Sequence, residues 1–223
     1  MATREAGSPQ AETALASLCE IYWFPVYAFI RRSGHSQDDA RDLTQAFFTR
    51  VLEKNYFKDA RQERGRFRAF LLTAVRHFLS NQRDADRAQK RGGGHTHLPL
   101  EFDDGERRYL LEPVEHDTPE RVYERKWALA VIAQAMQALT GKYERSGRRQ
   151  MFEAVRPFLT GDEPGSYADL AGRLETTEGA LRVAVHRLRQ QFATVLRETI
   201  AETVERPEDV DEELRHLLTA VAS

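Results

Sequence analysis

The apolar side chains of this chain recur with the 3.6-residue period of an α-helix along most of its length. In "GALRVAVHRLRQQF", Leu181, Val185 and Leu188 fall on one stripe of a helix, and most positions between them are arginine, histidine or glutamine. No stretch shows two alternating apolar runs joined by a hairpin turn, which an antiparallel sheet would need. The sequence therefore predicts an all-α fold.

Helix-start signals indicate where several of these helices begin. Ser36 is followed by Asp39, and Ser166 by Asp169, at the three-residue spacing of a capping box. Thr118 stands before a proline, a combination typical of the first turn of a helix. These positions predict helices on both sides of the middle of the chain.

Three helices and a basic tail are expected in the first half, over residues 12–91. The second half, residues 119–200, is expected to begin with a long helix that stops at Gly141 and to continue with a helix over about 146–159. Residues 201–223 are expected to form an acidic tail with a short helix.

The net charge of −2 conceals blocks of opposite sign. Residues 60–91 carry nine basic and three acidic side chains, whereas residues 92–120 carry two arginines and eight acidic side chains. From Glu198 onward there are again two arginines against eight acidic side chains. A basic block is where a polyanion such as DNA would bind.

The acidic stretch in the middle of the chain begins "GGGHTHLPLEFDDGE" and is rich in glycine and proline. This composition is typical of a connection between domains. We therefore expect residues 92–118 to be a flexible acidic linker between two helical domains.

Other classes of protein are excluded by composition. Charged residues make up 30% of the chain, and no window has the roughly 18 apolar residues of a membrane-spanning helix, so we expect no insertion into a membrane. The first residues lack the apolar core of a secretory signal, and Cys19 is the only cysteine, which predicts a cytoplasmic location. His95 and His97 lack neighbouring ligands, so we expect no metal site, no cofactor and no enzymatic activity.

The stretch "SYADLAGRLETTEGALRVAVHRLRQQF" predicts a short helix, a tight turn capped by Thr177, and a longer helix with an arginine-rich face. Ala171 is small enough for two helices to cross closely. This is the pattern of a helix-turn-helix, whose second helix enters the major groove of DNA. Two helices that only pack on each other, with a basic solvated face, are the alternative.

Together, the two basic regions resemble the extracytoplasmic-function class of bacterial RNA polymerase sigma factors. "DLTQAFFTRVL" is similar to the family's polymerase-binding helix, and "GRFRAFLLTAVRHFLSNQRDADRAQKR" looks like its promoter-melting helix. The helix-turn-helix stretch matches the domain that binds the upstream promoter element. The resemblance implies a factor that binds core RNA polymerase, recognises the −10 and −35 promoter elements and promotes transcription initiation.

The resemblance also assigns roles to individual residues. Those expected to bind polymerase are Asp42, Leu43, Gln45 and Phe48. Those expected to bind the −10 element as single-stranded DNA are Arg76, His77, Asn81 and Arg83. Those expected to bind the −35 element are Thr177, Glu178, Arg182, His186, Arg187 and Arg189. Cations that hold phosphates or guanines suit both DNA roles.

The sequence departs from the family at the turn between the last two helices, where Glu175 replaces a glycine. We expect Glu175 to adopt a left-handed backbone conformation at a cost of about 1 kcal/mol. Two alternatives to a sigma factor stay open. One is a helix-turn-helix regulator that binds DNA without joining the polymerase, and the other is a helical adaptor that binds only proteins.

Control of activity also stays open between an anti-sigma factor, phosphorylation and the tail itself. One hypothesis is that Asp103, Asp104 and Glu106 of the linker mimic nucleic acid inside the polymerase. Another is that the acidic tail covers the basic recognition helix, against the simpler reading that the tail completes a domain core.

Overall fold

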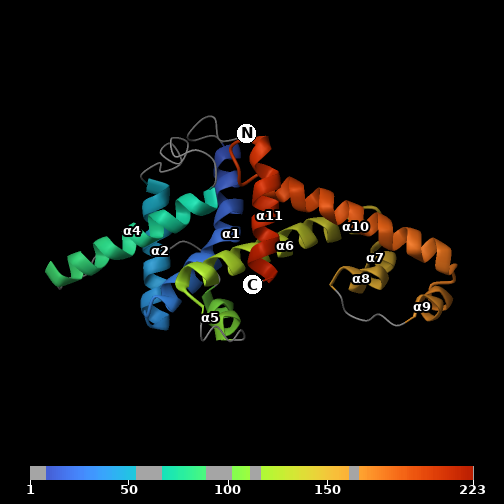
Figure 1. Ribbon diagram of the computed structural model, residues 1–223, viewed down its shortest axis with the longest axis horizontal. Helices are drawn as coiled ribbons and strands as arrows, with labels where there is room; N and C mark the ends of the chain where they lie inside the picture. The colour runs from blue at the N-terminus through green and yellow to red at the C-terminus, as the bar shows by residue number, and fades with distance from the viewer. Residues whose placement is uncertain (1–8, 54–66, 89–101, 111–116, 161–165, 223) are drawn as a thin grey trace. The chain divides into compact units, whose positions relative to one another are not determined.

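The computed structural model describes residues 9–53, 67–88, 102–110, 117–160 and 166–222, and no β-strand occurs in them (Figure 1). The all-α prediction is confirmed for this part of the chain. The helices are α1 (Pro9–Arg32), α2 (Gln37–Glu53), α4 (Phe67–Ala88), α5 (Phe102–Leu110), α6 (Pro119–Arg145), α7 (Arg149–Val155), α8 (Pro157–Thr160), α9 (Tyr167–Arg173), α10 (Glu178–Ala201) and α11 (Val210–Ala222), with a 3-10 turn η1 (Pro207–Asp209) before α11.

The contacts divide the chain into two compact units. Unit 1 comprises residues 1–130 together with 200–223, and unit 2 comprises residues 131–199. This division does not follow the domain boundaries expected from the sequence, because α6 and α10 each contribute to both units. Unit 1 is discontinuous in sequence: the chain leaves it after residue 130 and returns at residue 200.

The core of unit 1 is built on the apolar stripe of α1 that the sequence predicted. Tyr22, Val26 and Ile30 are fully buried. The Phe47 ring of α2 packs edge-on against Phe78 of α4, with centroids 5.6 Å apart. Burying aromatic and branched side chains from several helices provides the main free energy that holds such a unit together.

Two segments expected at the periphery pack into unit 1. Helix α5 forms within the stretch expected to be a flexible linker, and Glu106 on it is buried. Helix α11, at the end of the acidic tail, buries Glu213 and Leu217. The short helix predicted for the tail is therefore confirmed, and its contacts are those of unit 1.

The core of unit 2 combines α6, α7, α9 and α10. The predicted stripe of α10 is buried, with Leu181 and Leu188 at 0% exposure. Leu139 of α6 and Phe152 of α7 lie in the same core region of this unit, both almost fully buried. One stripe of α10 is thus committed to packing, as its period indicated.

The end of α6 differs from the prediction. The helix continues through Gly141 to Arg145, and the turn glycine is Gly147, with φ +69°. The backbone N–H of Arg148 donates to Tyr143 O at 3.0 Å, and that of Gly147 to Glu144 O at 3.0 Å. This is a Schellman motif, which requires a left-handed residue after the last helical turn, so the prediction that α6 stops at Gly141 was wrong.

The single helix expected over about 146–159 is instead the two short helices α7 and α8. They meet at Arg156, directly before Pro157. Proline lacks the N–H that would continue a helix and restricts the residue before it, which explains why the pattern is broken there.

Candidate nucleic-acid interface

Helix α9 begins at the capping residue that the sequence predicted. Ser166 is the N-cap, and its Oγ accepts a hydrogen bond from the backbone N–H of Asp169 at 3.1 Å. The Ser166 hydroxyl in turn donates to the Asp169 carboxylate at 2.7 Å. These two bonds satisfy a helix end that would otherwise have to rely on water, and they set where α9 starts.

The turn after α9 confirms the expectation for Glu175, whose φ is +50°. The backbone N–H of Thr176 donates to Ala171 O at 3.0 Å, and that of Glu175 to Gly172 O at 3.3 Å. This is again a Schellman motif, with glutamate at the left-handed position that glycine usually occupies. The turn reverses the chain within a few residues and brings α10 directly after α9.

The start of α10 is capped by Thr177, as predicted. Its Oγ1 accepts a hydrogen bond from the backbone N–H of Ala180 at 3.2 Å. Thr177 and Glu178 are both exposed. The first turn of α10 therefore presents backbone N–H groups and a hydroxyl to solvent, at the helix end that carries a partial positive charge.

Arg182 is held in place at the exposed junction of α9 and α10. Its guanidinium lies 4.4 Å from the centre of the Tyr167 ring and 3.5 Å from the Glu178 carboxylate. Tyr167 is itself stacked on Phe158 of α8, with centroids 4.7 Å apart. An arginine stacked on an aromatic ring loses less conformational freedom when it binds a ligand.

The remaining predicted side chains of α10 point in different directions. Arg189 donates to Phe158 O at 3.2 Å, so part of its function is to tie α10 to α8. His186 is exposed. Arg187 lies five residues after Arg182, which at 100° a residue places the two about 140° apart around the helix. Arg182 and Arg187 therefore cannot read the same base edges.

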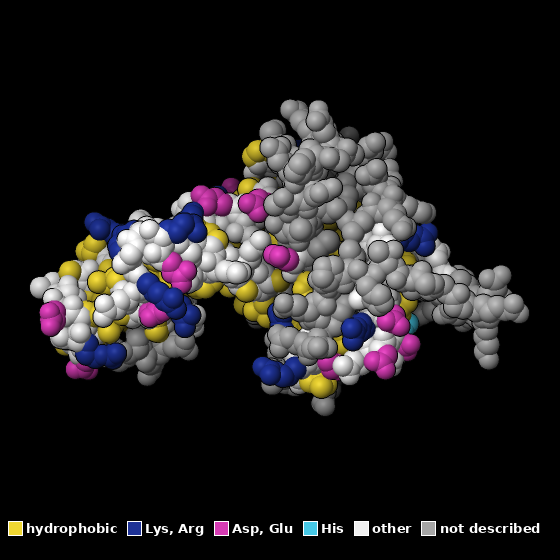
Figure 2. All heavy atoms as spheres, turned by 180° about the vertical axis from the view of Figure 1, so that it is seen from behind, with side chains coloured by type: hydrophobic (Ala, Val, Ile, Leu, Met, Phe, Trp, Pro, Cys, Tyr) yellow, Lys and Arg dark blue, Asp and Glu magenta, His cyan; other side chains and the backbone are white. Residues whose placement is uncertain are grey.

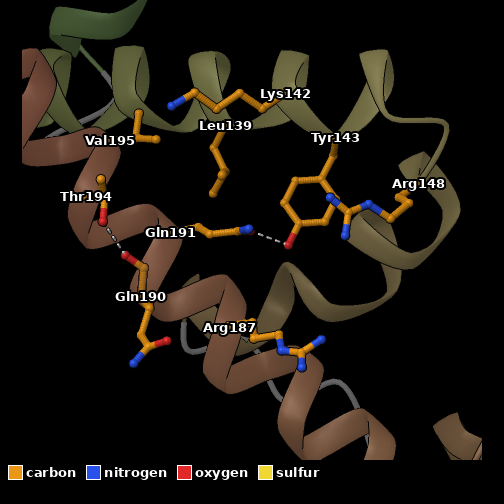
Figure 3. Close-up of a pocket in the computed structure, with 9 residues that line it drawn as sticks. All are labelled: Leu139, Lys142, Tyr143, Arg148, Arg187, Gln190, Gln191, Thr194 and Val195. Carbon is orange, nitrogen blue, oxygen red and sulfur yellow. Dashed lines mark hydrogen bonds between the residues drawn. The ribbon is translucent and has the colours of Figure 1, made fainter.

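Arg187 lines a hollow in unit 2 of about 340 Å³ (Figure 3). The lining residues come from the end of α6, the following turn and α10: Leu139, Lys142, Tyr143, Arg148, Arg187, Gln190, Gln191, Thr194 and Val195. Sequence reasoning missed the hollow and its two further cations, Lys142 and Arg148. Nothing in their local spacing links them to Arg187, about 40 residues later in the chain.

The charges of unit 2 are mixed. Residues 131–199 carry ten Lys or Arg and eight Asp or Glu side chains, a net of +2 in a chain whose net charge is −2. On the face that Figure 2 shows, basic and acidic side chains of this unit alternate and do not form one basic sheet. Binding of DNA here would depend on a few well-placed cations more than on a large positive field.

Helix α4 presents three of its four predicted contacts to solvent. Arg76, His77 and Asn81 are exposed, and the side chain of Arg83 lies outside the described residues. Arg76 faces Glu120 at 3.7 Å, an exposed pair that contributes little to stability and can be exchanged for another partner. The opposite face of α4 is packed through Leu71 and Val75.

Helix α2 presents fewer of its predicted contacts. Asp42 is exposed and Leu43 is half-buried, but Gln45 and Phe48 are 5% and 2% exposed. The Phe48 ring lies edge-on to Phe47, with centroids 5.4 Å apart. In this conformation Gln45 and Phe48 belong to the core of unit 1, and only Asp42 and part of Leu43 are available to a partner.

The acidic residues of the expected linker are not free in the way the nucleic-acid mimic requires. Arg31 donates from Nε and Nη2 to the two carboxylate oxygens of Glu106 at 2.9 and 2.7 Å, and Tyr27 donates to the same carboxylate. The hydrogen bonds from Arg31 outweigh the opposing effect of burial and hold the pKa of Glu106 below its usual value. Asp103 and Asp104 have side chains outside the described residues.

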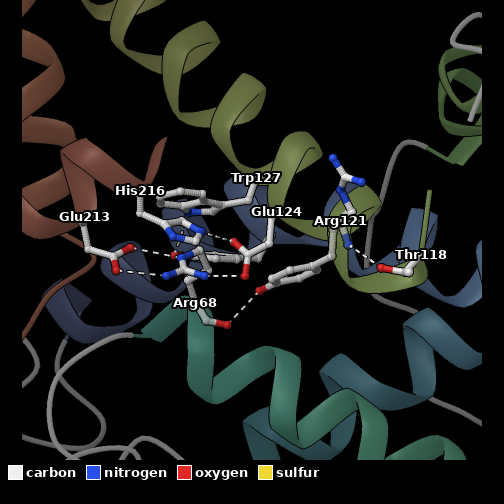
Figure 4. A network of polar contacts seen from close by, with 9 residues as sticks. Arg68, Thr118, Arg121, Glu124, Trp127, Glu213 and His216 are labelled. Atoms are coloured by element: carbon white, nitrogen blue, oxygen red, sulfur yellow. Dashed lines mark hydrogen bonds and ion pairs between the residues drawn. The ribbon is translucent and has the colours of Figure 1, made fainter. Parts of the chain in front are cut away.

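A second charged network lies inside unit 1 (Figure 4). Arg68 of α4 donates to both oxygens of Glu213 of α11 at 3.1 Å, and it also pairs with Glu124 of α6. Glu124 is 2.8 Å from His216 Nε2, and the Arg68 guanidinium lies 4.9 Å from the Trp127 ring centre. Burial opposes the charge of Arg68, but Glu213 and Glu124 outweigh it and raise its pKa. This network joins three helices and has no open side for a ligand.

The described residues contain no group of three His, Cys, Asp or Glu side chains placed to hold a metal ion. Among the helices in this part of the chain, none has the length and apolar character needed to cross a membrane. Comparison with family models, curated proteins and solved structures matches none of them to this chain.

Proposed function

We propose that this chain is a sigma factor, similar to the extracytoplasmic-function class, that brings core RNA polymerase to promoters. In this proposal α9 and the first half of α10 form a helix-turn-helix that binds the −35 element. The exposed face of α4 binds the −10 element as its strands separate. The polymerase carries out catalysis, and the chain contributes by binding the opened promoter more tightly than the closed one.

One observation carries the proposal: a short helix, a Schellman turn at Glu175 and a capped longer helix with a stacked, exposed Arg182. A helix-turn-helix inserts the amino-terminal part of its second helix into the major groove, where arginine can donate two hydrogen bonds to guanine. A second set of exposed side chains on α4, Arg76, His77 and Asn81, provides a cation and polar groups for an unstacked strand.

The proposal is tested by mixing the chain with sigma-free core polymerase and assaying co-purification and run-off transcription from upstream regions of its source genome. Asp42→Ala should weaken co-purification about tenfold, because Asp42 is the exposed member of the proposed polymerase contact. Asp38→Ala is the matched control, since Asp38 is exposed one turn earlier on α2. Absence of both co-purification and transcripts with the wild-type chain rejects the proposal.

A helix-turn-helix regulator that works without the polymerase is the second candidate. The burial of Gln45 and Phe48 favours it, because it leaves α2 with few side chains to offer a partner. Specific binding to a promoter fragment, together with no detectable binding to core polymerase, would distinguish this regulator from a sigma factor.

A further inference from the structure

The hollow beside α10 brings together positive charge without a matching acid. Lys142, Arg148 and Arg187 line it, and none of the nine lining residues is acidic. Lys142 is paired outside the lining with Glu198, at 3.1 Å. Among the residues that the structure describes, neither Arg148 nor Arg187 has an acidic partner. Two such guanidinium groups beside one hollow favour an anion between them.

The floor of the hollow is apolar and rigid. Leu139, Tyr143 and Val195 are at most 7% exposed. The Tyr143 hydroxyl donates to Gln191 Oε1 at 2.6 Å, which leaves the amide nitrogen of Gln191 as a donor at the hollow. An apolar floor keeps water from one side and strengthens the attraction between an anion and the cations around it.

Arg148 is positioned by its neighbours and keeps donors in reserve. Its guanidinium lies 5.1 Å from the centre of the Tyr143 ring, and its Nε donates to Ser146 Oγ at 3.1 Å. The Schellman turn at Gly147 fixes the backbone from which it extends. In Figure 3, Arg148 and Arg187 lie toward the same side of the hollow, and Lys142 extends the opposite way. The two terminal nitrogens of each guanidinium match two oxygens of a phosphate.

We infer that this hollow is a seat for one phosphate group, held by Arg148 and Arg187 with the Gln191 amide as a further donor. The phosphate can come from the DNA backbone or from a free phosphate or phosphomonoester. The DNA source rests on the proposed function: if the Arg182 face of α10 enters a major groove, Arg187, about 140° away, faces the backbone that borders the groove. A volume of about 340 Å³ accommodates the phosphate and part of the molecule that carries it.

The test uses the full chain as wild type, Arg148→Gln, Arg187→Gln and the matched control Arg156→Gln. Arg156 is exposed in the same unit and does not line the hollow. The first measurement titrates inorganic phosphate at constant ionic strength and follows the NMR signals of the Gln191 amide and the arginine side chains. The second measures binding to a short duplex of arbitrary sequence at several salt concentrations. Circular dichroism checks that each variant keeps its helix content.

For a phosphate seat, inorganic phosphate should shift the signals of the hollow in wild type and in Arg156→Gln, and the two other variants should bind it at least about tenfold more weakly. If the source is DNA, each of these two variants also binds the duplex about tenfold more weakly, and the slope of log K against log salt falls by about one. If the source is a free phosphate compound, phosphate binding is lost in the variants but duplex binding equals that of wild type.

The inference is overturned if phosphate shifts no signal of the hollow and both variants bind the duplex as wild type does. Failure of the proposed function looks different, since it is a failure to join polymerase and support transcription. A wild-type chain that binds no duplex at all still gives a decisive answer through the phosphate titration.

Discussion

Glu175 adopts a backbone conformation that costs a residue with a side chain about 1 kcal/mol. It is the one non-glycine residue with positive φ among those the structure describes. The hydrogen bonds of the Schellman turn hold it there, because without the left-handed residue α9 would not end where it does. Strain of this kind persists where the surrounding structure determines the turn.

Glu175→Gly should therefore raise the free energy of unfolding by about 0.5 kcal/mol. Glycine removes the left-handed penalty but makes the unfolded chain more flexible, so only part of the gain is retained. Chemical denaturation monitored by circular dichroism measures the change. Ala193→Gly, on the exposed face of α10, is the control and should cost about 1 kcal/mol. Equal destabilisation by both substitutions would contradict the strain at Glu175.

The second prediction at this scale concerns the ion pair of Glu106 and Arg31. Glu106→Gln keeps the shape of the side chain but removes the charge that the mostly buried Arg31 needs, and should cost about 1–3 kcal/mol. The folded-state pKa of Glu106 is lower than its usual 4.5. The contribution of the pair is thus fully present above about pH 4.5 and is lost as the pH falls through the folded-state pKa.

Measuring the free energy of unfolding from about pH 7 to pH 3 checks this expectation. The difference between wild type and Glu106→Gln should be constant near neutral pH and shrink on acidification. Glu153→Gln is the control, because the Glu153–Arg149 pair is 2.7 Å long but exposed, and its loss should change stability little. A difference that stays constant down to about pH 3 would contradict the assigned direction of the pKa shift.

At the scale of elements, α11 and α5 show how segments of acidic composition become parts of a core. Helix α11 turns Glu213 inward against Arg68, and α5 turns Glu106 inward against Arg31. Gly105 permits the close approach of α5, because a Cβ there would lie 3.1 Å from the Trp23 ring. Acidic residues that looked like solvated charge in the sequence are partly structural.

Truncation after Ile200 is the prediction for α11. Without Glu213, Arg68 stays buried with only Glu124 for its charge, and unit 1 should lose about 3 kcal/mol or more of stability. Glu213→Ala should reproduce most of the loss, and Glu205→Ala, an exposed carboxylate before α11, should not. Denaturant unfolding gives these values. Duplex affinity of the truncated chain should not rise, and a clear rise would instead favour the tail as an inhibitor of DNA binding.

At the scale of the whole molecule, unit 1 is closed by residues from both ends of the chain. Arg68 and Glu213 are 145 residues apart, and α6 and α10 both continue from one unit into the other. Unit 1 can therefore form completely only after the carboxy-terminal residues are available. Contacts of such separation slow folding more than they limit final stability.

A chain in which residues 131–199 are replaced by a Gly/Ser linker should keep the fold of unit 1. Trp127 is fully buried in that unit, so its fluorescence should stay blue-shifted and should shift to the red on denaturation. The same chain carrying Glu213→Ala is the control and should unfold at a lower denaturant concentration. Red-shifted fluorescence in the excised chain without denaturant would show that unit 1 needs residues 131–199.

Local chemistry was enough to predict the helices, because caps and apolar stripes depend on neighbours within a few residues. Ser166, Thr177, Glu175 and the buried stripe of α10 all behave as the sequence indicated. The stop of α6 was missed because Gly141 and Gly147 look alike in sequence, and only the second sits where the helix end needs a left-handed residue.

Tertiary structure alone decided which polar residues are buried and which cations meet. Gln45 and Phe48 lie inward because α2 packs on α1, and Glu106 and Glu213 lie inward because distant arginines receive them. Arg148 and Arg187 share a hollow because α6 and α10 pass beside each other within unit 2. These pairings depend on contacts between residues far apart in the chain, which periodicity and capping, as local signals, do not encode.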